Sequence, residues 1–375
     1  MRIVLDNIIF SLQPAGGISL YWYELLRRMI RDGLDVTALE DVRGPANLFR
    51  ARLSLPPGRV LTRRFPPVQV ARYLPCRAPR AGGAVFHSSY YRWPLAKGWR
   101  TVQTVHDFTY EHARRGAARW IHAFQKRLAL MGAHRVICVS SHTRQDLERF
   151  LPTLPRERVR VILLGCGQAF RPIPESKLPP GVSRNRFPKG YLLYVGSRVS
   201  YKNFEEAVAA VGLSGDYGLV VAGGGPLRPD HRALLNRRLR GRFVHLERLD
   251  DEALNGLYNH AHALIYPSTR EGFGLPVVEA MAAGCPVIAV RASAIPEIAG
   301  KAALLVDWPS REALAVCIRN LENPSRRRRL RAEGFANARR FSWERCYRQT
   351  VAVYAELAAG GGTRSRGCFQ NDVLR

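Results

Sequence analysis

Two glutamates stand on either side of a glycine–aromatic–glycine turn in the stretch EGFGLPVVEA, residues 271–280. Glu271 precedes the turn, and Glu279 falls one turn inside a short helix that Pro276 would begin and that would end before Gly284. The two side chains can therefore face one ligand from two sides. A carboxylate offers two acceptor oxygens, which match the paired hydroxyls of a ribose or a hexose. The alternative is a structural loop, with Glu271 in solvent and Glu279 in a salt bridge.

Two features of the sequence could bind a phosphate without a metal ion. The amides of Gly274, Leu275 and Val277 would be free at the N-terminus of the helix, which is a ready anion site. Arg198 and Lys202 follow another expected strand, four residues apart in VGSRVSYKN. Two cations there could clamp a diphosphate and neutralise a leaving group. Taken alone, each is more often a solvated surface charge.

Two strand ends in the first half of the chain carry further candidates. Gly16 and Gly17 in QPAGGISLYW would let the backbone approach a phosphate closely, although the GxGxxG spacing is missing. His106 and Asp107 end another expected strand and could bind sugar hydroxyls if they face a cleft; a structural histidine is the alternative. The sequence contains no Walker A loop, GxSxG, HExxH or Cys/His nucleophile pattern.

Short β-branched runs alternate with helical patterns along the whole chain, which is typical of βαβ units and parallel sheets. Residues 171–190 contain five prolines and little apolar periodicity, and we expect a linker there. The expected strands before the linker are 2–7, 35–40, 83–89, 101–107, 135–140 and 158–165. Those after it are 191–197, 218–225, 242–249, 263–268, 285–290 and 302–307. Two doubly wound domains predict a ligand cleft at the carboxyl ends of their strands.

Length and composition agree with this division. A chain of 375 residues exceeds the usual size of one hydrophobic core. No apolar run reaches the roughly 18–20 residues that span a bilayer, and the N-terminal MRIVLDNIIF is interpreted as a first strand, not a signal peptide. The seven cysteines are scattered singly, without a CxxC pair, which predicts reduced thiols and a cytoplasmic protein.

The formal net charge of +28 calls for an anionic partner, which could be nucleic acid, a membrane surface or a phosphorylated substrate. Arginine bias along the whole chain is the alternative. No zinc finger, RNP motif or basic zipper accompanies the charge, so we expect no specific nucleic-acid partner. A basic nucleic-acid-binding protein remains the competing hypothesis from a different class, although Glu271 and Glu279 would repel a phosphate backbone.

The sequence resembles the retaining glycosyltransferases of family GT4, which have the GT-B fold. EGFGLPVVE fits the E-x7-E motif of that family and is followed by AMAAGCPVIA. VGSRVSYKN, the GGIS turn, the VHD strand end and VICVSSHTRQDL occur in the family's order over most of residues 1–345.

The resemblance implies two Rossmann-like, doubly wound α/β domains that face each other across a cleft. Residues 1–170 would form the acceptor-side domain, and 191–342 the domain that binds the nucleotide-sugar. A helix over 343–359 would pack back on the first domain, with a tail over 360–375.

The resemblance also implies residue roles. Glu279 would bind the ribose, and Glu271 and His106 would contact the donor sugar. Arg198 and Lys202 would hold the diphosphate, so that neither a divalent metal nor another cofactor is needed. The other expected substrate-binding positions are Gly16, Gly17, Asp107, Leu249, Phe273, Gly274 and Leu275.

The expected reaction moves a hexosyl group, mannosyl as a first guess, from a GDP- or UDP-sugar to a saccharide or a lipid-diphosphate-linked acceptor. Surface polysaccharide would be the product. A sugar phosphorylase or an epimerase on the same fold is the alternative within enzymes. Residues 43–80 are rich in arginine, proline and apolar side chains, and we expect them to contact an anionic membrane at the cytoplasmic face or a lipid-diphosphate acceptor. An ordinary surface loop is the other interpretation of this region.

Overall fold

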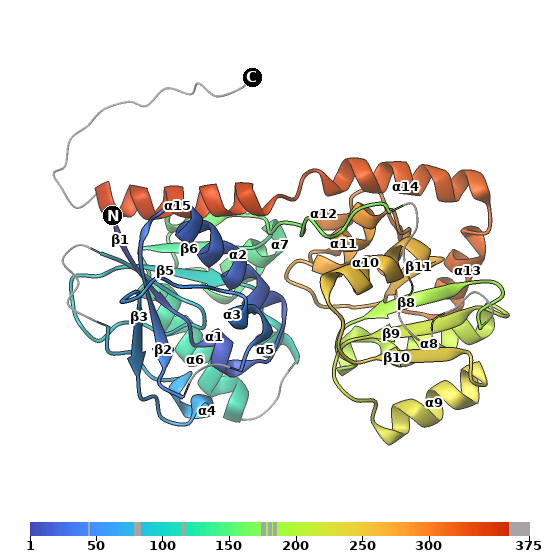
Figure 1. The fold of residues 1–375 in the computed structure, drawn as a ribbon, viewed down its shortest axis with the longest axis horizontal. Coiled ribbons are helices and arrows are strands. Elements are labelled where there is room, and N and C mark those ends of the chain that lie inside the picture. The colour runs from blue at the N-terminus through green and yellow to red at the C-terminus, as the bar shows by residue number, and fades with distance from the viewer. Residues whose placement is uncertain are drawn as a thin grey trace.

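The computed structural model describes residues 1–43, 46–78, 84–113, 117–173, 178, 182 and 186–359. They form two domains, each built on one parallel sheet with helices on both faces (Figure 1). The strand order is β3-β2-β1-β4-β5-β6-β7 in the first sheet and β10-β9-β8-β11-β12-β13 in the second. The predicted α/β class with two doubly wound sheets is therefore confirmed.

Every strand pairing is parallel. The central strands read as continuous apolar runs such as YLLYV and GLVVA, because helices cover both faces of each sheet. The strands of the first sheet are β1 (Arg2–Asp6), β2 (Asp35–Asp41), β3 (Val60–Arg63), β4 (Val85–Ser88), β5 (Arg100–Val105), β6 (Arg135–Cys138) and β7 (Val159–Val161). Those of the second are β8 (Tyr191–Val195), β9 (Gly218–Ala222), β10 (Phe243–Leu246), β11 (Ala263–Tyr266), β12 (Val287–Val290) and β13 (Leu304–Val306).

Helices connect the strands and also follow the last one. The α-helices are α1 (Ile9–Leu12), α2 (Gly17–Arg31), α3 (Leu48–Ala51), α4 (Val68–Ala71), α5 (Thr109–Ala113), α6 (Ala117–Met131), α7 (Ser141–Phe150), α8 (Phe204–Leu213), α9 (Pro229–Leu239), α10 (Asp251–His260), α11 (Leu275–Ala283), α12 (Ile295–Ala299), α13 (Arg311–Asn320), α14 (Pro324–Ala338) and α15 (Trp343–Ala359). Two short 3-10 turns are η1 (Arg156–Arg158) and η2 (Ser200–Lys202). Among the described helices, none is long and apolar enough to cross a bilayer.

The edge strand β3 is the one strand that the alternation does not predict. It lies within 43–80, the stretch interpreted as a surface segment, and pairs with β2 through Val60–Ala38 to Arg63–Asp41. Its four residues, VLTR, are half-buried or exposed and follow two prolines, so no buried apolar run marks them. The tail over 360–375 and most of 174–185 in the expected linker lie outside the described residues.

The last helix returns to the first domain. Figure 1 shows α15 lying along that domain, and it contacts α2, β4 and β5. Arg28 and Arg31 of α2 bind Glu344 at 3.2 and 3.1 Å. The chain passes from one domain to the other twice, after β7 and again before α15, and the two crossings lie side by side. The amide of Cys166 in the first donates to the carbonyl of Phe341 in the second at 3.4 Å. No side chain fits at Gly165, where a Cβ would lie 2.0 Å from the nitrogen of Trp343.

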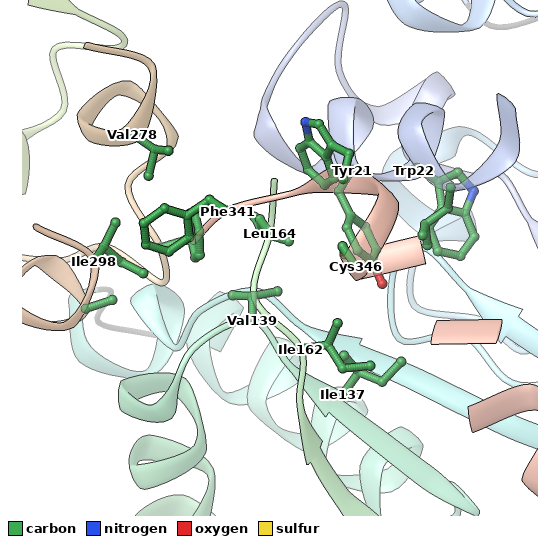
Figure 2. Packing of buried hydrophobic residues seen from close by; sticks show 14 of the residues in the cluster. Tyr21, Trp22, Ile137, Val139, Ile162, Leu164, Val278, Ile298, Phe341 and Cys346 are labelled. Atoms are coloured by element: carbon green, nitrogen blue, oxygen red, sulfur yellow. The ribbon is translucent and has the colours of Figure 1, made fainter. Parts of the chain in front are cut away.

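One apolar cluster runs through both domains. Figure 2 shows Phe341 between Val278 and Ile298 of the second domain and Leu164 of the first. Phe273 meets the ring of Phe341 edge-on at 5.5 Å. The two domains are therefore packed against each other at the base of the cleft that their strand ends define.

Candidate active site

The carboxyl ends of β5 and β11 meet at Gly272. A Cβ at this position would lie 1.6 Å from the carbonyl oxygen of His106, which follows β5. The carbonyl of Gly272 accepts hydrogen bonds from the hydroxyls of Ser140, at 2.7 Å, and Thr143, at 3.2 Å. The turn between the two motif glutamates is thus docked directly on the first domain, and only glycine permits this approach.

A carboxylate of the second domain supports the same contact. Glu297 on α12 accepts hydrogen bonds from the amides of Ser141, at 3.0 Å, and His142, at 3.1 Å. These amides form the N-terminus of α7, where a negative charge is favourable. Glu297 is not among the residues predicted from sequence, since nothing local in the sequence indicates that its partners come from another domain.

A pocket of about 210 Å³ opens beside this contact. The first domain contributes Asp107, His112 and Asp146 to its lining, and the second contributes Arg270 and Glu271. Its walls carry carboxylates, imidazoles, guanidinium groups and hydroxyls, which suit a ligand with many hydroxyls. Asp107 and Glu271, predicted from separate motifs, therefore lie on one pocket.

Lys202 and Glu271 form an ion pair within the site. The Lys202 Nζ atom lies 2.9 Å from Glu271 Oε1 and 3.5 Å from the hydroxyl of Tyr266. Both members of the pair are largely buried, with 15% of each side chain exposed. An ammonium has three donors, so Lys202 keeps capacity for an anion while Glu271 positions it. The alternative that Glu271 lies free in solvent does not hold.

Arg198 is held by a glycine loop. Its Nη1 donates to the carbonyl of Gly223 at 2.9 Å, and its Nη2 donates to those of Gly224, Gly225 and Pro226 at 2.9, 2.6 and 2.9 Å. The three glycines have φ values of 72°, 76° and 76°, a left-handed run that L side chains rarely adopt. In this structure protein oxygens occupy both terminal nitrogens of Arg198, so the clamp expected from its spacing to Lys202 stays a prediction.

Glu279 is buried in α11. Its Oε2 accepts a hydrogen bond from the hydroxyl of Tyr258 at 3.1 Å. Burial raises the pKa of Glu279 to about 7, and the bond from Tyr258 acts in the opposite direction. The side chain therefore faces a hydroxyl, not the cation that the salt-bridge alternative requires.

The buried carboxylate leads to a pH-dependent prediction. Glu279 has a pKa near 4.5 when unfolded, so between pH 4.5 and 7 the folded state retains a proton that the unfolded state has lost. Stability then falls with rising pH, by at most about 3 kcal/mol for this one group. We expect Glu279→Gln to raise the Tm at pH 8 by several degrees, and the advantage to disappear near pH 4.5.

Thermal unfolding followed by circular dichroism at both pH values checks this. Glu297→Gln, which replaces a carboxylate used in the domain contact, is the matched control and should lower the Tm at pH 8. An unchanged Tm of Glu279→Gln at pH 8 would contradict the raised pKa. If Glu279 binds a ribose, as the family resemblance implies, Glu279→Gln should also weaken nucleotide binding, because an amide accepts hydrogen bonds from hydroxyls less strongly than a carboxylate.

Two helix N-termini face each other across the cleft. A Cβ at Gly17, the first residue of α2, would lie 3.3 Å from Leu275 Cδ1, at the first residue of α11. The N-cap residues, Gly16 and Gly274, supply no side-chain cap to either helix. By contrast, Ser140 caps α7 and Asp250 caps α10. The positive ends of α2 and α11 are therefore available to an anion.

One of the three expected amides is not available. The amide of Val277 donates to the carbonyl of Gly274 at 3.0 Å, closing a turn at the start of α11. Gly274 has a φ of 102°, which only glycine adopts readily. The expectation of a free Val277 amide is therefore wrong, because the left-handed N-cap folds the first turn back on itself.

The remaining predicted residues lie around the same cleft with different degrees of contact to it. His106 meets the ring of Tyr21 edge-on at 5.1 Å, and burial lowers the pKa of His106 to about 4, so the imidazole is neutral at physiological pH. Asp107 accepts a hydrogen bond from the amide of Thr109 at 3.0 Å and starts α5. Phe273 is buried against Phe341 and anchors the turn through its side chain, which leaves its backbone for a ligand.

Leu249 is half-buried in the loop between β10 and α10, just before the N-cap of α10. It lies at the carboxyl edge of the second sheet, as a base-flanking position must. In the described part of the chain, no group of three His, Cys, Asp or Glu side chains is arranged to hold a metal ion. Lys202, Arg149 and Arg270 bring positive charge to the site, and the two helix ends add to it.

Comparison with known proteins agrees with this geometry. Family descriptions match the chain in both halves: Glycosyltransferase Family 4 over residues 15–166 and Glycosyl transferases group 1 over residues 183–336. The chain is 30% identical over 273 residues to O-antigen chain mannosyltransferase B of Escherichia coli, an alignment that covers 69% of this chain and 71% of the relative.

Solved structures with the same fold cover nearly the whole chain. Sucrose-phosphate synthase from Thermosynechococcus elongatus matches with a TM-score of 0.73 at 22% identity, covering 96% of this chain and 100% of that one. HepE of Anabaena, solved in complex with UDP-glucose, matches with a TM-score of 0.68 at 16% identity, covering 95% and 100%. One family description covers each domain, and together they span most of the chain. The chain therefore belongs to the GT4 family of glycosyltransferases and has the GT-B fold.

Proposed function

We propose that this glycosyltransferase moves a hexosyl group from a nucleoside diphosphate sugar to a saccharide or a lipid-linked saccharide, with retention and without a divalent metal. The observation that carries the proposal is the pair of uncapped helix N-termini, α2 and α11, beside Lys202. Two helix ends and an ammonium can hold the two phosphates of a donor. The solved complex of HepE with UDP-glucose supports a nucleotide-sugar as the ligand of this fold.

The donor would extend from Glu279 to the pocket. Glu279 accepts hydrogen bonds from the ribose hydroxyls, and the diphosphate lies between the starts of α2 and α11. The hexosyl ring then reaches Glu271, with His106 and Asp107 on its other side. We infer this placement from the kind of group that each part of the donor needs. The ribose needs a carboxylate, the diphosphate needs positive helix ends, and the hexosyl ring needs a pocket that suits hydroxyls.

Bond cleavage at the anomeric carbon transfers negative charge to the terminal phosphate. Lys202 and the two helix ends stabilise that charge, which is the role that a divalent cation has in other glycosyltransferases. An acceptor hydroxyl attacks the same face of the sugar and gives its proton to the departing phosphate oxygen. The new glycosidic bond then has the configuration of the old one, and nucleoside diphosphate is released.

A mannosyl donor such as GDP-mannose is the first candidate, because the relative from Escherichia coli is an O-antigen chain mannosyltransferase. Synthesis of a surface polysaccharide follows from the same relative. Six described cysteines are free, which fits a reducing cytoplasmic site of synthesis.

A panel of nucleotide-sugars tests the proposal directly. We expect GDP-mannose, or another single donor, to raise the Tm and to be slowly hydrolysed, and both effects to persist in EDTA. When inorganic phosphate is added in place of the acceptor, no sugar phosphate should form. This result separates a glycosyltransferase from a sugar phosphorylase. Activity that EDTA abolishes and Mg²⁺ restores would overturn metal independence. A panel without a stabilising nucleotide would overturn the donor class.

A further inference from the structure

One helix of the first domain exposes an apolar face. On α6, Trp120 is 71% exposed and Phe124 63%, and Ile121 and Leu128 are also exposed. Their spacing places the four side chains on one side of the helix. Monomeric proteins rarely expose such a cluster without a binding partner. We call these four residues the outer face of α6.

The opposite face of α6 packs against the active site. Lys126 is buried, and its Nζ donates to the carbonyl of Asp107 at 2.6 Å and lies 3.2 Å from Glu111 Oε1. Gln125 donates to the carbonyls of Arg72 and Tyr91, which joins α6 to the segments that follow α4 and β4. The position of α6 is therefore fixed, and its exposed side chains belong to an ordered surface.

The neighbouring segments add more exposed apolar groups and positive charge. Val70 in α4, Leu74 just after it and Leu95 after β4 are exposed, and Figure 1 shows α4 and α6 at the same edge of the domain. Cys76 and Pro94 form a parallel β-bridge. The exposed Arg77 and Lys97 follow these two residues, so they lie on neighbouring segments of the chain. Basic and apolar side chains thus share one edge.

Carboxylates are missing from this part of the sequence. Residues 42–145 contain 19 Lys and Arg but only two acids, Asp107 and Glu111. Asp107 lines the active-site pocket, and Glu111 is buried. The other 271 residues contain 39 basic and 28 acidic residues, so the chain does not lack acids in general. Arginine bias alone would add arginines but would not remove acids from one stretch.

We infer that the outer face of α6, with the basic segments 59–78 and 95–97, docks this protein on the surface of an anionic lipid bilayer. Aromatic and aliphatic side chains enter the headgroup region, and the arginines and lysine meet anionic lipids. A nucleic acid would bind the positive charges, but it would not bury the exposed apolar side chains Ile121, Leu128, Val70 and Leu95. The surface predicted from sequence, 43–80, supplies charge, whereas the aromatic anchors come from α6.

Docking in this way would bring the bilayer close to the reaction. The inner and outer faces of one helix are about 10 Å apart. Because Lys126 on the inner face contacts Asp107, the pocket lies about one helix thickness from the lipid surface. A lipid-linked acceptor could then present its saccharide to the pocket while its lipid stays in the membrane.

Vesicle flotation tests the inference without any substrate. Full-length protein is mixed with vesicles of phosphatidylcholine alone, or of phosphatidylcholine and phosphatidylglycerol in equal parts. We expect flotation with the anionic vesicles only. Trp120→Gln/Phe124→Gln should reduce the vesicle-bound fraction at least about tenfold. Trp308→Gln is the matched control, since Trp308 is 74% exposed on the other domain, and it should float like the wild type.

A second pair of variants tests the charge. Arg77→Gln/Lys97→Gln should lower binding to anionic vesicles about tenfold, whereas Arg237→Gln/Arg238→Gln on α9 should leave it unchanged. Equal binding to both vesicle types, or equal loss in both charge variants, would overturn the inference. So would an RNA competitor that binds through the same residues, or a dimer that Trp120→Gln/Phe124→Gln dissociates. Nucleotide-induced stabilisation should persist in all variants, so failure here and failure of the donor proposal are distinguishable.

Discussion

Lys202→Ala should lower kcat by about three orders of magnitude and weaken nucleotide binding far less, because the two helix ends and Glu279 still hold the nucleotide. Glu271, in the loop that leads into α11, holds the ammonium of Lys202 at 2.9 Å. The charge of Lys202 matters most when the terminal phosphate departs. Removing one donor that stabilises a developing negative charge costs about 10²–10³ in kcat elsewhere. In the proposed mechanism the same ammonium also takes the place of a metal, so we expect the upper end.

Steady-state kinetics with a saturating donor, together with nucleotide affinity by calorimetry, measure this split. Lys189→Ala is the matched control, because Lys189 is exposed and pairs with Glu322 away from the cleft. Lys202→Ala removes the ammonium and also leaves the buried Glu271 carboxylate without its partner. The double variant Lys202→Ala/Glu271→Gln removes both charges and so separates these two effects. If the double variant regains most of the activity, Lys202 acts by neutralising Glu271 and not on the phosphate. Wild-type turnover in Lys202→Ala would refute the assignment outright.

Gly272→Ala should be nearly as damaging, through geometry and not through charge. A Cβ there would lie 1.6 Å from the carbonyl oxygen of His106, so the domain contact cannot form as it stands. Gly272 has no left-handed φ, which means that alanine strains the contact and not the local backbone. A displacement of about 1 Å can cost about 10² in rate, and we expect a fall in kcat of at least that size.

The readouts for Gly272→Ala are kcat and the radius of gyration from small-angle scattering. We expect a lower kcat, a more open particle and weaker but not abolished nucleotide binding, because the contribution of α2 is lost while Glu279 and α11 stay together in the second domain. Gly167→Ala is the matched control, since a Cβ there meets Phe170 at an ordinary 3.4 Å. Normal turnover and an unchanged radius in Gly272→Ala would show that catalysis does not need this domain contact.

Alternation of apolar runs with helical patterns was sufficient to predict most of the fold. Buried parallel strands such as β8 and β9 have no polar face, so their residues are apolar throughout and easy to recognise. β3 has no such run, because an edge strand shares only one neighbour and keeps exposed side chains. The expected strand 158–165 is longer than β7, since the apolar residues after Val161 pack in the core without pairing as a strand.

The site was predicted unevenly for a related reason. Glu271, Lys202 and Asp107 follow strands at the carboxyl edge, a place that the alternation already identifies. Glu297 and Ser140 act on partners in the other domain, and sequence spacing contains no information on such contacts. For Arg198, the sequence suggested a contact that this structure does not show: its spacing to Lys202 predicted a ligand shared by the two side chains. The fold instead presents the carbonyls of a left-handed glycine loop to it.

The position of α15 has a consequence for how the protein is made. Its Tyr354 and Cys346 are fully buried in the first domain, where the Tyr354 hydroxyl hydrogen-bonds to His87 of β4. A ribosome synthesises these residues only after the whole second domain has been made. The first domain therefore keeps an incomplete interior until α15 has been made, and nascent chains stalled before residue 343 should be targets for chaperones and proteases.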